Sequence, residues 1–532
     1  MKLKSEALHF EIMPGKNQPS GYIRNSYRED GKIKHQTVSR INGLSMERLL
    51  AMKAAFDGDV IKRDDIIISE GREYGASNLL YRLSKRIGLD KMIYSRSEPW
   101  VRDALAMIIG RVVYQGSKLS LSKIPQISCL WEICGISEKD INVDKHCYDS
   151  MDRLFARQKQ IQKKLAAKHL KTGSVILYDI TSSYLEGEYE YSKLSRYGYN
   201  RDRKRGKKQI VIALICAKDG CPIAVEVFPG NTNDGATLQA KVAEIKDKYG
   251  IGRFIIVGDR GMLTQKNINT CDGIDTITAL THSAMKTLCE EKNVQLSLFD
   301  ENTTTEVILP DEPCARYALR LNPKRRENER ETRAAVIEKT QTELEKIAVP
   351  KRKTDAKTLA ARAAKVFAKY KTEKYFIWDV LDMKIIYSVK QDIVRNEEKY
   401  DGLYVIRSSV QSDVMSIQEI VEAYKSLINV EQAFRNMKTV QLEIRPVYHR
   451  TDDRIKAHVF ICMLAYYLFW HMNKALAPLY AQHPEYTRSS VLDKMKALQK
   501  VKLTVAGTQT FTVAKPSDTQ LYIQNLIAGY CA

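Results

Sequence analysis

The stretch SVILYDITSSY, residues 174–184, decides the fold class of this 532-residue chain. Before it, apolar residues recur every three or four positions, as in helices, whereas here they form runs and alternate, as in strands. Three more segments of this kind follow, at 209–217 (QIVIALICA), 223–230 (IAVEVFPG) and 253–261 (RFIIVGDRG). A helical segment at 236–248 separates the third of these strands from the fourth.

The lengths of the connections predict how these strands pair. Short connections between the first three strands favour antiparallel pairing, whereas a strand that follows a crossover helix pairs in parallel with an earlier one. The expected fold is α/β, with a mixed sheet and flanking helices. This order of elements resembles that of an RNase H-like catalytic core, whose first part we place at 171–283.

The chain before this core divides into two further units. Segments 21–28 and 32–40 flank Asp30-Gly31, a dipeptide that favours a tight turn, so we expect a small β-hairpin module within 1–75. Residues 76–170 have helical periodicity and predict a helical domain. This basic helical domain could bind DNA ends, and a purely structural support for the core explains it equally well.

The second half of the chain returns to the core after a change of composition. Residues 284–399 combine a charged helical run with alternating strands, which we interpret as an insertion domain. Residues 400–475 would complete the core with a strand (DGLYVIRSS) and a long helix that begins at the N-cap Ser416 and ends near Lys438. The remaining residues, 476–532, form a C-terminal tail region.

The longest apolar run, 459–470, is much shorter than the roughly 20 residues that a membrane span needs. It predicts a buried core helix and no membrane partner. The ten cysteines are scattered without a CxxC pair, and the first residues lack the apolar segment of a signal peptide. These features indicate reduced thiols in a cytoplasmic protein.

The chain is strongly basic, since 85 lysines and arginines outnumber 64 acidic residues and give a formal net charge of +21. Such a charge favours a polyanionic partner, with nucleic acid ahead of a membrane surface, although charge can also serve solubility alone. The densest cationic run, 193–208, would follow a DNA backbone, whereas a solvated hairpin loop is the alternative. Its candidate DNA-binding residues are Arg201, Arg203, Lys204, Arg205, Lys207 and Lys208.

Two aspartates are notable at the predicted strands. Asp179 lies inside the first strand, where burying a carboxylate is costly unless it is paired, hydrogen-bonded or bound to a cation. A metal ion, a lysine or a backbone donor would each account for it. Asp259 follows the apolar run 254–257, at a strand end of the kind where α/β sheets bind ligands. Ordinary turn chemistry beside Gly258 and Gly261 is the alternative for Asp259.

Glu431 lies on the predicted late helix, seven residues from Tyr424 and seven from Lys438. Seven residues make nearly two helical turns, so the three side chains would project in one stripe. A surface helix on which Glu431 pairs with Arg435 is the alternative. The apolar residues that would anchor the stripe to the sheet are Leu427, Val430 and Phe434.

These spacings resemble a known signature. Tyr424-x2-Leu427-x3-Glu431-x6-Lys438 is similar to the Y-x2-R-x3-E-x6-K pattern of a large branch of bacterial insertion-sequence DDE transposases. The segments YDITSSY, YGYNRDRKRGKKQ, FPGNTND, VGDRGM and RPVYHRTDDRIKAHVFICMLAYYL also look like that family. Leu427 stands where the signature has arginine, so an arginine contact with phosphate at that position is not carried over.

The resemblance implies a metal-dependent enzyme that cuts DNA at the ends of an insertion sequence and joins them to target DNA. Asp179, Asp259 and Glu431 would be its catalytic, metal-binding triad and would hold two Mg²⁺ ions, for which Mn²⁺ can substitute. The implied partners are double-stranded DNA with inverted-repeat ends, target DNA and a second copy of the chain in a homodimer, in the bacterial cytoplasm. The residues of the same helix that would contact DNA are Tyr424, Arg435 and Lys438.

Two other functions stay open on the sequence. An RNase H-like nuclease or junction resolvase would cut without joining, but a bare nuclease has no need of a helical leader and a large insertion. A DNA-binding protein descended from a transposase would have a decayed active site, but all three acids are present in register.

Overall fold

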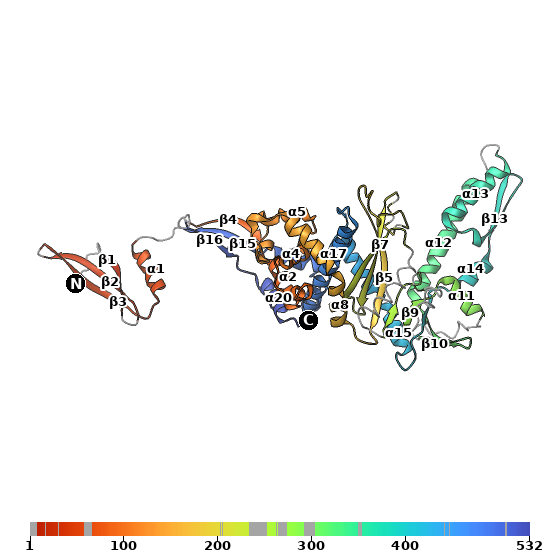
Figure 1. Ribbon diagram of the computed structural model, residues 1–532. Helices are drawn as coiled ribbons and strands as arrows, with labels where there is room; N and C mark the ends of the chain where they lie inside the picture. The colour runs from red at the N-terminus through yellow and green to blue at the C-terminus, as the bar shows by residue number, and fades with distance from the viewer. Residues whose placement is uncertain are drawn as a thin grey trace.

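The computed structural model describes residues 8–15, 18–29, 31–57, 66–199, 201–202, 204, 206–232, 253–261, 263, 274–291, 304–348, 354–440, 442–445, 447–505 and 508–531. The described elements form an elongated molecule, with the N-terminal strands at one end and a helical arm at the other (Figure 1). A large sheet lies between this arm and a body of helices.

The large sheet has eight strands among the described residues, in the order β10-β11-β14-β9-β8-β5-β6-β7. Its strands are β5 (Val175–Tyr184), β6 (Gln209–Ala217), β7 (Pro222–Pro229), β8 (Ile255–Val257), β9 (Asp275–Ala279), β10 (Thr305–Leu309), β11 (Glu312–Leu321) and β14 (Leu403–Ser408).

The pairing of the first four strands agrees with the sequence. β5 and β6 are antiparallel, as are β6 and β7, whereas β8 pairs in parallel with β5. The mixed sheet predicted from the connection lengths is therefore confirmed, as is the return of the chain to the core at β14. The helix expected at 236–248 lies outside the described residues.

Two strands that the sequence did not assign to the sheet extend its far edge. β11 pairs antiparallel with β14, and β10 pairs antiparallel with β11. Both strands belong to the range that we interpreted as an insertion, because their alternation alone does not say which sheet they join. The segment that follows them builds a separate layer with its own apolar core, including Leu344, Leu359 and Phe367. Its elements are α12 (Pro323–Ala348), α13 (Ala356–Tyr370), β12 (Phe376–Leu381), β13 (Lys384–Val389) and α14 (Gln391–Glu398).

A long apolar helix, α17 (Asp452–Ala475), lies in the main core. It packs on β7 and on two helices of the first half of the chain, α4 (Pro99–Val113) and α7 (Ser150–Ala156). Among the described residues it is the one helix long and apolar enough to cross a membrane, but 89% of its most apolar window is buried within the protein. A helix that is apolar on all sides is typical of a buried core, as predicted for 459–470.

The last part of the chain packs on the first helices. β15 (Gln499–Val505) pairs antiparallel with β4 (Ile66–Glu73) and with β16 (Thr508–Val513). The final helices complete the helical body, and no local pattern in the sequence indicates these contacts. The helices of this body, besides α4, α7 and α17, are α2 (Gly75–Arg86), α3 (Leu89–Ile93), α5 (Lys118–Ser122), α6 (Leu130–Ile133), α8 (Gln158–His169), α18 (Ala477–Gln482), α19 (Arg488–Lys496) and α20 (Asp518–Gly529).

The N-terminal strands form a small sheet of their own (Figure 1). β2 (Ser20–Glu29) and β3 (Lys32–Ile41) make the predicted hairpin, and Gly31 at its turn has the positive φ of 71° that glycine adopts readily. β1 (Leu8–Met13) adds a third strand, and α1 (Met46–Phe56) packs against it.

Candidate active site

One pocket of about 670 Å³ brings together three acidic residues that are distant in the sequence. Asp179 comes from the middle of β5, Asp259 follows the end of β8, and Glu431 lies on α16 (Leu427–Arg435). Among the residues that line it are also two arginines, Arg201 and Arg325. The pocket therefore combines carboxylates, which can hold a cation, with guanidinium groups, which can hold a phosphate.

The register of two parallel strands places the aspartates side by side. Leu177 of β5 is paired with Val257 of β8, the last residue of that strand. Asp179 and Asp259 each come two residues later, so they occupy equivalent positions beyond the last pair. Both aspartates line the same pocket.

Burial and neighbouring acids act on the carboxyl group of Asp179. Burial raises its pKa to about 6, and the nearby Glu431 and Asp259 act in the same direction. The Ile180 N–H donates a hydrogen bond to Asp179 Oδ1 at 2.8 Å, and the Arg201 charge opposes the rise. The environment therefore disfavours the ionised carboxylate, which a bound cation would favour.

Asp259 is exposed at the mouth of this pocket. Its Oδ1 accepts a hydrogen bond of 2.7 Å from the Arg260 N–H. This repeats the contact at Asp179, where the next backbone N–H also binds Oδ1. In both residues this local hydrogen bond orients the carboxylate. Among the described residues the second carboxylate oxygen makes no hydrogen bond, so it can bind a ligand.

The helix that carries Glu431 differs from the prediction, because it is broken. Ser416 caps it as expected, with Glu419 completing the capping box. However, α15 (Ile417–Lys425) ends at Ser426, α16 follows, and a π-helical turn, η7 (Asn436–Val440), succeeds α16. The Ser426 hydroxyl donates a hydrogen bond of 2.6 Å to the Ala423 carbonyl, a contact that bends helices.

Despite the break, Tyr424 and Glu431 line the same pocket. The predicted anchors are buried, at 9% exposure for Leu427, 0% for Val430 and 5% for Phe434. Burial raises the pKa of Tyr424 to about 12, and the charges of Asp259 and Glu431 add to the rise. Its hydroxyl is therefore protonated at neutral pH and able to donate a hydrogen bond.

Lys438 does not continue the stripe into the pocket. Its ammonium donates to Asp202 Oδ1 at 2.7 Å, to the Ser182 carbonyl at 2.6 Å and to Thr181 Oγ1 at 3.0 Å. Asp202 also pairs with Arg445 at 3.0 Å. Lys438 lies inside the π-helical turn, whose wider winding departs from the seven-residue spacing of a regular α-helix. Lys438 thus connects the Glu431 helix to β5 and to the basic segment.

The hydrogen bonds of Lys438 lead to a prediction about the stability of the protein. Replacing Lys438 with methionine should lower the free energy of unfolding by about 1–3 kcal/mol, because buried acceptors lose their donor. Urea denaturation of the purified protein measures this change. The matched control is the exposed lysine of α8, Lys159→Met, which should leave stability within about 0.5 kcal/mol. Equal stability of the two variants would contradict the internal role of Lys438.

The other predicted DNA-binding residues lie in different surroundings. Arg201 is in the active-site pocket, where its side chain donates to the Ile180 carbonyl at 2.9 Å. Lys204 is exposed, Lys208 is partly exposed, and Lys207 pairs with Glu186 at 2.8 Å. The two remaining residues of this set, Arg203 and Arg205, lie outside the described residues. Arg435 lines a second pocket rather than the one that holds the three acids.

Three residues of this region were missed on the sequence. Asp202 is the only acid among the cations of 193–208, and that contrast is the one signal that could have identified it as the partner of Lys438 and Arg445. Asn322 and Arg325 line the pocket from the start of α12, in a charged run with no distinguishing pattern. The Asn322 side chain accepts from the Arg325 N–H at 3.1 Å, so it also caps the first turn.

The donor set suits a hard divalent cation, since Mg²⁺ prefers carboxylate oxygens. Within the described part of the chain, however, no three His, Cys, Asp or Glu side chains are close enough to form a preassembled metal site. Three like charges repel one another, and both Asp259 and Glu431 are exposed and able to rotate. The side chains have the chemistry to bind a divalent cation. Their coordination geometry would form only when the cation binds.

An α/β chain with this mixed sheet, and with acids at the ends of its parallel central strands and on a later helix, is consistent with the RNase H-like class. Residues 170–468 match the family model described as "Transposase DDE domain". Because this match covers more than half of the chain, the protein belongs to that family and is a DDE-domain transposase. No curated protein matches the chain.

Proposed function

We propose that this protein is an insertion-sequence transposase that cuts DNA at the element's ends and joins those ends to target DNA in a metal-dependent reaction. The observation that carries the proposal is the single pocket into which Asp179, Asp259 and Glu431 converge. We further place the chain in the branch with the Y-x2-R-x3-E-x6-K signature, on the spacing of Tyr424, Glu431 and Lys438.

The proposed roles follow from the chemistry of each side chain. Asp179, Asp259 and Glu431 would hold two Mg²⁺ or Mn²⁺ ions, which when bound would promote in-line displacement at phosphorus by stabilising the attacking and leaving oxygens. Arg201 would bind a non-bridging oxygen of a DNA phosphate, and Tyr424 would donate a hydrogen bond to the DNA backbone. Lys438 would act mainly by positioning, because its ammonium keeps the Glu431 helix against β5.

The rest of the chain has proposed roles in DNA handling. The helical body at 76–170 is a candidate for binding the element's ends, and 284–399 is a candidate insertion domain. We propose a homodimer that pairs two inverted-repeat ends in the bacterial cytoplasm. The nine described cysteines are free thiols, which is compatible with such a compartment.

The test is a cleavage and joining reaction. Purified protein is incubated with labelled duplex DNA that carries the element's own ends, a supercoiled target and Mg²⁺ or Mn²⁺. We expect cuts at the ends, released 3′-hydroxyl groups and covalent products of the ends with the target. Cuts without joined products would favour a nuclease or resolvase, and binding without cuts would favour a decayed DNA-binding protein.

A second prediction concerns the basic segment. Replacing Lys204 and Lys208 together with alanine should lower the slope of log affinity against log salt concentration by about two, roughly one for each phosphate that a lysine no longer neutralises. Fluorescence anisotropy with duplex DNA at several salt concentrations measures the slope. The control is the exposed pair Lys32 and Lys53 of the N-terminal module, whose double alanine variant should keep the wild-type slope. An identical slope in both double variants would remove this segment from the DNA path.

A further inference from the structure

A second pocket, of about 600 Å³, lies beside the helix that carries Glu431. α16 contributes to both cavities, because Glu431 lines the active-site pocket while Gln432 and Arg435 line the second one. The opposite wall comes from the C-terminal helices, chiefly from the turn before α19. The lining residues are Gln432, Arg435, Asn436, Tyr480, Tyr486, Thr487, Arg488 and Ser489.

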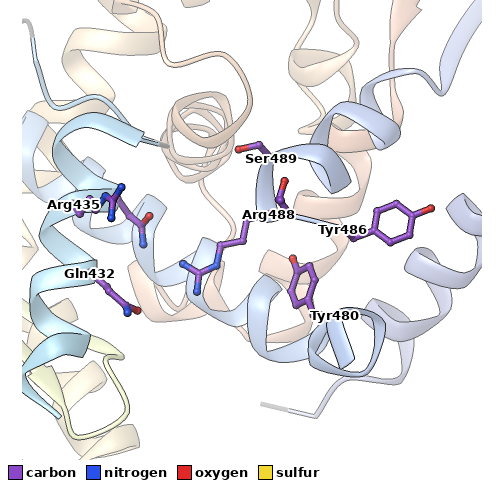
Figure 2. A pocket seen from close by; sticks show the side chains of 8 residues that line it. Gln432, Arg435, Tyr480, Tyr486, Arg488 and Ser489 are labelled. Atoms are coloured by element: carbon purple, nitrogen blue, oxygen red, sulfur yellow. The ribbon is translucent and has the colours of Figure 1, made fainter. Parts of the chain in front are cut away.

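Two arginines from different elements face this second pocket. Figure 2 shows the Arg488 side chain extending toward the helix that carries Gln432 and Arg435. None of the described residues that line the cavity is acidic, and the remaining polar groups are amides and hydroxyls, which can donate hydrogen bonds. Such walls fit an anion, and arginine forks match the geometry of phosphate.

Arg488 has no carboxylate partner among the described residues, so its charge can bind an anion. It is exposed, and no acidic side chain of the described residues forms an ion pair with it in the structure. Its charge acts on Tyr480 of the wall and on the buried Tyr466. The Tyr480 hydroxyl donates to Asn473 at 3.3 Å, so this wall has a defined side-chain arrangement.

We propose that the second pocket binds a phosphodiester group of the DNA backbone that flanks the phosphate at the active site. This inference rests on the proposed function, because it requires DNA in the neighbouring pocket. Glu431 and Arg435 are four residues apart on α16, which is about 6 Å along the helix. Because the same helix lines both pockets, a DNA strand bound at the active site would pass beside the second pocket.

The proposal predicts contacts that position DNA without reading its sequence, since a phosphate carries no base information. Arg488 contributes one side of the clamp and Arg435 the other. The C-terminal region, which packs on the first helices, would thereby bind the same strand as the core. This gives residues 476–532 a role in holding DNA.

The test measures DNA binding by the full chain without catalysis. A fluorescent 30-base-pair duplex is titrated with wild type, Arg488→Gln and Arg488→Lys in EDTA at several salt concentrations, with Arg48→Gln in the N-terminal module as the exposed arginine control. We expect Arg488→Gln to weaken binding about five- to tenfold and to lower the salt slope by about one. Arg488→Lys should keep the slope, because it keeps the charge, and unrelated duplexes should show the same changes.

The outcomes separate this inference from the proposed function. If Arg488→Gln binds duplex DNA with the affinity and slope of wild type and Arg48→Gln, the phosphate site is wrong even if the protein cuts and joins DNA. If the weakening appears with single-stranded RNA and not with duplex DNA, the inference is also wrong. If the slope falls as expected while wild type neither cuts nor joins, the binding site stands and the proposed function fails. Matching melting temperatures of the variants exclude misfolding.

Discussion

Glu431→Gln is expected to abolish both DNA cleavage and end joining, with a loss of at least about a thousandfold in rate. Changing residues outside a metal's ligands typically costs about 10- to 100-fold, and removal of one charged ligand should exceed this. Glutamine keeps the size of the side chain and removes the charge that a divalent cation requires. The measurement is single-turnover cleavage of the labelled end duplex in Mg²⁺ and in Mn²⁺.

The control for this variant is Glu422→Gln, which makes the same chemical change at an exposed position of α15. It should cut at the wild-type rate. DNA binding in EDTA should be unchanged in Glu431→Gln, which separates a chemical defect from a binding defect. Cleavage by Glu431→Gln within about tenfold of wild type would show that the acid of this helix has been assigned wrongly.

Lys118→Met is expected to stabilise the protein by about 1–4 kcal/mol at pH 7, because lowering the pKa of this lysine costs about 1.4 kcal/mol for each pH unit, which exceeds the value of its hydrogen bond to His458. Lys118 is only 5% exposed, and its Nζ lies 3.0 Å from His458 Nδ1. Burial lowers its pKa to about 7, and the neighbouring Arg111 adds to the fall. The thiols of Cys147 and Cys462 act in the opposite direction, and the imidazoles of His449 and His458 also face this lysine.

The pKa of Lys118 determines how the stability of the protein changes with pH. The pKa of Lys118 is about 7 in the folded protein and 10.5 for an ordinary lysine. Between these values the unfolded chain binds more protons, so this residue makes stability rise with pH, by up to about 1.4 kcal/mol per pH unit. This gain in stability is complete above pH 10.5, the pKa of the lysine in the unfolded chain, and it is lost as the pH falls toward 7.

Urea denaturation of wild type and Lys118→Met at pH 7 and pH 9 isolates this contribution. The stability advantage of the variant should shrink at pH 9, because removing the proton of the wild-type lysine costs less as the pH approaches its ordinary pKa. Lys159→Met, at an exposed position, should show no such change between the two pH values. An advantage that is absent at pH 7, or equal at both pH values, would show that Lys118 is not buried as described.

Several features of the fold could be predicted from local sequence. β5, β6 and β7 were predicted from runs of apolar residues, and α17 from an apolar segment too short for a membrane span. The N-cap at Ser416 also agreed with its sequence pattern. Such features depend on neighbours within a few positions, so a pattern of spacing or a capping residue is enough to predict them.

The helix break at Ser426 and the direction of Lys438 were not predictable in this way. Both depend on contacts across the fold: Lys438 binds Thr181, Ser182 and Asp202, which lie more than two hundred residues earlier. The periodicity of the helix gave no sign of the π-helical turn that contains Lys438. Likewise, β15 pairs with β4 although more than four hundred residues separate them.

By itself, then, the sequence predicted the central strands and the long apolar helix, the basic character of the chain, and which three acids are candidates for one site. Only the tertiary structure decided that these acids share a pocket with Arg201 and Arg325, and that Arg435 faces Arg488 across another. The physical reason is that segment type follows from local periodicity, whereas a pocket is formed by residues that only the packing of distant segments brings together.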